Sequence, residues 1–137
     1  MGDDEPVPML ERPWVRQVYD EPDGRRALAI WLHNSRVIFT RITPMTKIVR
    51  DAVGADPEMA AQWETNQRQR FTAHRVLAQQ LAAKQALRAG LSVDDAADTI
   101  FALVSPEVYQ LLTVERGWSP DRWERWITRA LADTLLG

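Results

Sequence analysis

Helix-start signals follow one another closely in the last third of the chain, from Leu91 to Gly137. Serines stand at the expected starts, Ser92, Ser105 and Ser119, and each of the last two is followed by proline and then by an acid. A serine hydroxyl accepts a hydrogen bond from a free backbone N–H at a helix start. Proline in the first turn loses no hydrogen bond, and the helix dipole favours an acid there. Gly117 has the chemistry of a left-handed residue that ends the middle helix. This stretch therefore predicts short, well-bounded helices.

The predicted helices of this stretch carry broad apolar faces with the i, i+3, i+4 spacing of a packed helix. Such faces exceed what one small domain needs to bury, and pairing two helices with the same two from another copy gives a four-helix bundle. We therefore expect a homodimer, and the alternative is an ordinary monomeric core. The predicted interface comprises Val104, Val108, Leu111, Leu112, Trp123, Trp126, Ile127, Ala130, Leu131 and Leu135.

Helical patterns also fill the part of the chain before Leu91. Trp14–Tyr19 predicts a short helix, and Arg25–Ala52 carries a long apolar seam that Pro44 should break or sharply kink into two helices sharing one buried line. Pro57 to about Leu87 predicts the longest helix, which Gly90 should end.

No sustained period-2 alternation is present, so no strand is expected. The predicted fold is an all-α bundle of about six to seven helices. It forms one domain over residues 1–137, with residues 1–13, rich in acids and proline, as a flexible lead-in.

The predicted helix from Pro57 places polar residues in the middle of its apolar seam: Gln67, Arg70 and His74, with Trp63 toward its start. A buried polar group needs a partner, so these side chains either line a ligand pocket, face water or bond to buried carbonyl groups. Aromatic walls with a few polar groups are typical of small-molecule pockets. The predicted ligand-binding residues are Trp31, Ser35, Phe39, Trp63, Gln67, Arg70, Phe71, His74 and Phe101.

Composition argues against several other functions. The 137 residues carry a net charge of −2, no cysteine and two histidines on different predicted helices. We therefore expect no metal site, no cofactor, no catalytic residues and no direct binding of nucleic acid. The apolar runs are too short to cross a membrane, and no signal peptide is visible, which favours a cytoplasmic protein.

The order of the motifs LSVDDAAD, SPEVYQLL and ERGWSPDRWERW between Leu91 and Leu136 resembles the C-terminal end of TetR-type transcriptional regulators. The earlier segments DEPDGRRAL, ITPMTKIVRDAVGADPE and LRAGLS also fit this family, so the resemblance covers nearly the whole chain. It implies an effector-binding and dimerisation domain that senses a small hydrophobic molecule and couples its binding to a DNA-reading helix-turn-helix.

The residues ahead of the first long helix are acidic and rich in proline, and they contain no recognition helix. We therefore expect the N-terminal DNA-binding domain to be missing. The alternative is a stand-alone helical dimerisation or interaction module without a small-molecule effector.

Overall fold

Each predicted serine cap begins a helix in the computed structural model, which describes residues 8–137 apart from the side chains of Thr46 and Lys47. The helices are α4 (Val93–Leu103), α5 (Pro106–Gln110) and α6 (Pro120–Leu135). The serine hydroxyls accept hydrogen bonds from the backbone N–H three residues later, at 3.0, 3.1 and 3.1 Å. Gly117 has a φ of +72°, and the following N–H of Trp118 donates to the carbonyl of Leu112 at 2.9 Å. The sequence-based interpretation of these ends is confirmed.

Between α5 and α6 the chain forms a π-helical turn, η3 (Leu111–Glu115), which the sequence did not predict. The N–H of Arg116 donates to the carbonyl of Leu111 at 3.1 Å, five residues back. A π-turn inserts a residue into the helical register and rotates the following side chains away from the face they would otherwise occupy. Within this turn, Leu111 and Val114 are 57% and 55% exposed.

The first half of the chain forms a 3-10 turn, η2 (Pro8–Glu11), and the helices α1 (Pro13–Asp20), α2 (Gly24–Val53) and α3 (Pro57–Ala83). Asp23 and Asp56 cap α2 and α3 by accepting backbone N–H groups two residues later, at 3.1 and 2.9 Å. Residues 1–7 of the predicted flexible lead-in lie outside the described part. The rest of the lead-in is ordered, because Met9 and Leu10 pack against the core.

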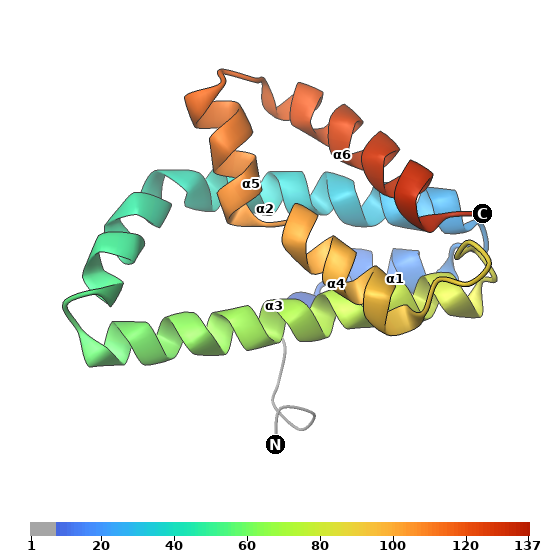
Figure 1. The fold of residues 1–137 in the computed structure, drawn as a ribbon, viewed down its shortest axis with the longest axis horizontal. Helices are drawn as coiled ribbons and strands as arrows, with labels where there is room; N and C mark the ends of the chain where they lie inside the picture. Colours follow the sequence, from blue (N-terminus) through green and yellow to red (C-terminus); the bar gives the residue numbers. More distant parts are fainter. Residues whose placement is uncertain (1–7) are drawn as a thin grey trace.

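The prediction of two helices around Pro44 is wrong, because α2 continues through this proline to Val53. The second half of α2 bends toward the start of α3 (Figure 1), as expected where a proline removes one hydrogen bond of the helix. The buried line does not extend through the proline either. Ile42, just before Pro44, is 37% exposed, and Met45 and Ile48, after it, are 61% and 69% exposed.

The end of α3 also differs from the prediction. The helix ends at Ala83, and Gln85, with a φ of 57°, takes the left-handed conformation that had been expected of Gly90. Gly90, with a φ of 85°, is also left-handed but lies in the turn before α4. The segment between them binds the C-terminus, since the N–H of Gly137 donates to the carbonyl of Ala86 at 3.0 Å.

The buried residues lie in one part of the molecule, which we call the packed half: α1, the first half of α2, the second half of α3, and α4 to α6. The remainder, residues 40–72, has no buried side chain among those described, and we call it the arm. The arm consists of the second half of α2, the turn after it and the first half of α3, which together project from the packed half in Figure 1.

The packed half covers the apolar face of α6 within a single chain. Trp123, Ile127, Leu131 and Leu135 are fully buried, as is Val104 at the end of α4. These residues belonged to the predicted dimer interface, but α2 and α4 pack over them, so their side chains offer no surface to a second copy. Of the predicted interface, Val108, Leu112, Trp126 and Ala130 are half-buried and Leu111 is exposed.

Candidate functional site

The polar seam predicted on α3 runs from the arm into the packed half. Trp63, Gln67 and Arg70 are half-buried on successive turns, and His74, one turn later, is only 1% exposed. The seam therefore passes from half-buried side chains to a fully buried one at His74.

Arg70 holds the C-terminal end of α4. Its Nη1 donates to the carbonyls of Phe101 and Val104 at 2.8 and 3.0 Å, and its guanidinium lies 3.9 Å from the centre of the Phe101 ring. The last carbonyls of a helix have no partner within the helix and form the negative end of its dipole. Nε and Nη2 donate to Oε1 of Gln67 at 3.3 and 3.2 Å. For Arg70, the alternative of bonding to buried carbonyls is confirmed.

Burial lowers the pKa of Arg70, and the nearby carboxylate of Glu107 acts in the opposite direction. Glu107 lies in the first turn of α5. The guanidinium therefore links three elements: α3, which carries it, the end of α4, which it caps, and the start of α5, whose acid lies in its field.

His74 lies deepest in the seam, between the rings of Trp31 and Phe101, whose centres are 6.2 and 6.3 Å away. Its Nδ1 has no hydrogen-bond partner among the residues that the structure describes. Burial, and secondarily the charge of Arg70, lower its pKa from 6.5 to about 3. His74 is therefore neutral at physiological pH, in an environment that disfavours its protonated form.

The other predicted ligand-binding residues are divided between the core and its edge. Trp31, Ser35 and Phe39 are at most 4% exposed, and the Ser35 hydroxyl donates to the carbonyl of Trp31 at 2.9 Å. Phe71 and Phe101 are half-buried and meet edge to face, with ring centres 5.4 Å apart. These contacts give them a packing role in the present arrangement.

Trp63 lies in a different environment, because it lines an open pocket of about 340 Å³ where the arm meets α5 and η3. This volume falls within the range of small-molecule sites. The lining side chains are Arg50, Trp63, Glu107, Gln110, Leu111 and Glu115. Oε1 of Gln110 is a buried acceptor without a partner in the described part of the chain.

Most of this lining could not be found from the sequence. In the sequence, Glu107 is recognisable only as an acid at a helix start. The structure places it there, in the first turn of α5, and the sequence pattern gives no sign that it also lines a pocket. Gln110 and Glu115 reach the pocket through the π-turn, and no residue pattern in this segment announced such a turn. To place Arg50 in the lining, one would have to know that α2 continues past Pro44 and bends.

A second open pocket, of about 460 Å³, lies beside η2 and α1 and is lined by Leu10, Glu11, Arg12, Pro13, Arg16 and Tyr19. None of these residues carries a buried polar atom without a partner. Its lining gives no chemical indication of a ligand.

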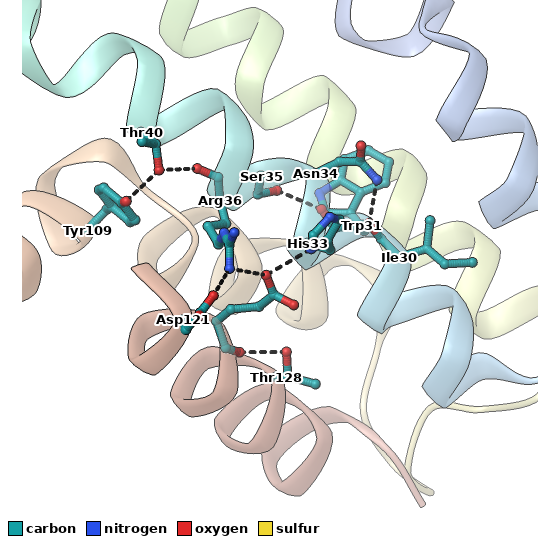
Figure 2. A network of polar contacts seen from close by, with 11 residues as sticks. Ile30, Trp31, His33, Asn34, Ser35, Arg36, Thr40, Tyr109, Asp121 and Thr128 are labelled. Carbon is teal, nitrogen blue, oxygen red and sulfur yellow. Dashed lines mark hydrogen bonds and ion pairs between the residues drawn. The ribbon is translucent and has the colours of Figure 1, made fainter. Parts of the chain in front are cut away.

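A polar network joins α2 to α5 and α6 (Figure 2). Arg36 pairs with Asp121 and lies 3.5 Å from Glu124, whose Oε1 is also 3.0 Å from Nδ1 of His33. Further along α2, the hydroxyls of Thr40 and Tyr109 are 2.7 Å apart. These contacts fix α6 and α5 against the same helix whose second half forms the arm.

Other classes of site find no support in residues 8–137. No group of three or more His, Cys, Asp or Glu side chains there is placed to hold a metal ion. Nor does that part of the chain include a helix with the length and apolar character needed to span a membrane. Comparison with known protein families, curated proteins and solved structures found no match to this chain.

Proposed function

We propose that this chain is an effector-binding and dimerisation domain of a TetR-type transcriptional regulator. The resemblance of its ordered motifs to that family supports the proposal, and so does the all-helical fold with helices that begin at those motifs. The observation that carries it is the position of the pocket. One of its walls, η3, also carries the exposed apolar residues Leu111 and Val114, so a ligand and a partner copy would meet at the same element.

This arrangement gives a route from ligand to dimer. A ligand in the pocket contacts Trp63 on α3 and Glu107 on α5. Glu107 lies in the field of Arg70, which caps α4 immediately before α5 begins. A ligand that favours one position of Glu107 therefore favours one orientation of α5 and η3, which would change how two copies pack. In an intact regulator that change would alter the spacing of the DNA-reading units.

The dimer is tested by light scattering at micromolar concentration. The parent chain should be a dimer, and Val114→Glu should be a monomer with an unchanged helical circular-dichroism spectrum, because it places a charge in the apolar contact. Ile48→Glu is the control, since Ile48 is also an exposed apolar residue but lies on the arm. A monomeric parent chain contradicts the proposed dimer.

Effector binding is tested by screening small hydrophobic compounds for an increase in melting temperature, since a ligand that binds only the folded state raises it. Trp63→Ala should abolish the response. Tyr19→Ala, which alters the second pocket instead, should preserve it. If no compound raises the melting temperature, or Tyr19→Ala abolishes the response, the pocket is not the effector site.

A second candidate function is an interaction module without an effector. The apolar side chains of Met45 and Ile48 favour it, because they lie on the arm and are 61% and 69% exposed. On this alternative, Ile48→Glu rather than Val114→Glu dissociates the dimer, and no compound raises the melting temperature.

A further inference from the structure

The pocket where the arm meets α5 and η3 contains more hydrogen-bond acceptors than donors. The carboxylates of Glu107 and Glu115 form no hydrogen bond or ion pair with another residue among those described, and Oε1 of Gln110 is buried without a partner. Oε1 of Gln110 has almost no accessible surface, so the two carboxylates are the acceptors that a ligand in the pocket can reach.

The nearby cations leave this excess in place. Arg70 is not among the lining residues, and its donors bond to the carbonyls of Phe101 and Val104 and to Gln67. Arg50 is the cation within the lining, and it faces two carboxylates there. The charged side chains of the lining therefore sum to one negative charge.

The rest of the lining is apolar. Trp63 offers an aromatic surface, and Leu111 is an exposed aliphatic side chain. An aromatic face attracts cations through its quadrupole and also packs against apolar groups. Acceptors and apolar surface thus occur in one pocket large enough for a small organic molecule.

We infer that this pocket binds an amphipathic organic cation, such as a protonated amine attached to an aromatic or aliphatic body. The inference rests on the proposed ligand-sensing function and names its ligand class. The ammonium group pairs with Glu107 and Glu115, while the body of the ligand packs on Trp63 and Leu111. An anionic ligand would be repelled by the two carboxylates, and a neutral one would gain no charge interaction with them.

The test uses ligands of one size that differ in their polar group: 2-naphthylmethylamine, 2-naphthylmethanol and 2-naphthoic acid. Isothermal titration should give the highest affinity for the amine, at least tenfold lower affinity for the alcohol and no measurable binding of the acid. Glu107→Gln and Glu115→Gln should each weaken amine binding about tenfold and leave alcohol binding unchanged, because they remove charge without changing shape. Glu64→Gln, at an exposed position of α3 outside the pocket, should change neither affinity.

The outcomes separate this inference from the proposed function. If the acid or the alcohol binds at least as tightly as the amine and Trp63→Ala abolishes that binding, the ligand class is wrong and the sensing function stands. Equal amine affinity in Glu107→Gln, Glu115→Gln and the parent chain also overturns the cation inference. If none of these ligands binds and a wider screen also fails, both are wrong.

Discussion

The packed half and the arm are built from the same two long helices, yet their side chains are buried very differently. On α2, Leu28, Trp31 and Leu32 are fully buried, whereas Met45 and Ile48 are 61% and 69% exposed. On α3, Leu77 and Leu81 are fully buried, whereas no side chain of residues 57–72 is fully buried. A helix becomes part of a core only where other helices cover it, and α1, α4 and α6 cover only one half of this pair.

This difference indicates a division of labour. Segments with few buried apolar contacts open at low cost in free energy, and elements that move on ligand binding are drawn from such segments. The arm is of this type, and the pocket lies where it meets the packed half. Arg70 and the network of Arg36, Glu124 and Asp121 mark the region where the two meet.

The largest predicted contrast comes from removing one tryptophan from each half. Trp123→Ala leaves a cavity in the packed half and should lower the free energy of unfolding by about 3–5 kcal/mol. Trp63 is half-buried beside an open pocket, so Trp63→Ala should cost about 1 kcal/mol or less, because the site can fill with water. Urea unfolding monitored by circular dichroism measures both. Equal costs would show that the arm is packed as tightly as the core.

The two arginines that join α3 to opposite ends of α4 give the next contrast. Arg70→Met leaves the carbonyls of Phe101 and Val104 without donors and should cost about 1–3 kcal/mol of stability. Arg75 pairs with Asp94 at the exposed start of α4, so Arg75→Met should cost below about 1 kcal/mol. Thermal unfolding of both variants checks this, and a larger loss for Arg75→Met would contradict the role given to Arg70.

His74 predicts a pH dependence that belongs to the packed half. Its pKa is about 3 in the folded chain and 6.5 in its ordinary state, so between these values the unfolded chain binds more protons and stability falls as the pH falls. Lowering the pH from 6.5 to about 5 should cost about 2 kcal/mol. His74→Phe removes this contribution. Its free energy of unfolding should fall less over that interval, and an unchanged pH dependence would contradict the assignment.

The smallest effect is expected for the network between α2 and α6. Asp121 and His33 are largely exposed, and such ion pairs are screened by water and salt. Arg36→Met should therefore lower stability by below about 1 kcal/mol. The loss should shrink further in 1 M sodium chloride, and thermal unfolding at low and high salt measures it. A large loss that salt does not reduce would show that the network holds α6 in place.

Much of the packed half follows from the sequence, because local chemistry decides it. Ser92, Ser105 and Ser119 cap their helices through atoms three residues away, and the periodicity that placed α1 and α3 is equally local. Trp123 and Leu135 were predicted to lie in a dimer interface, but they are buried within the single chain. An apolar stripe on a helix shows that the helix face must be covered, but it does not show which element covers it. The candidate site was harder still. It depends on the π-turn, which no residue pattern announced, and on the continuation of α2 through Pro44, which the sequence did not predict.

Hydrogen exchange with and without 2-naphthylmethylamine, followed by mass spectrometry, tests the division between the arm and the packed half most directly. The account predicts that peptides within residues 40–72 exchange faster than those of α4, α6 and the first half of α2. It also predicts that the amine slows exchange mainly in the arm, α5 and η3. Equal protection of the arm and the packed half, or slowing confined to the packed half, would contradict it.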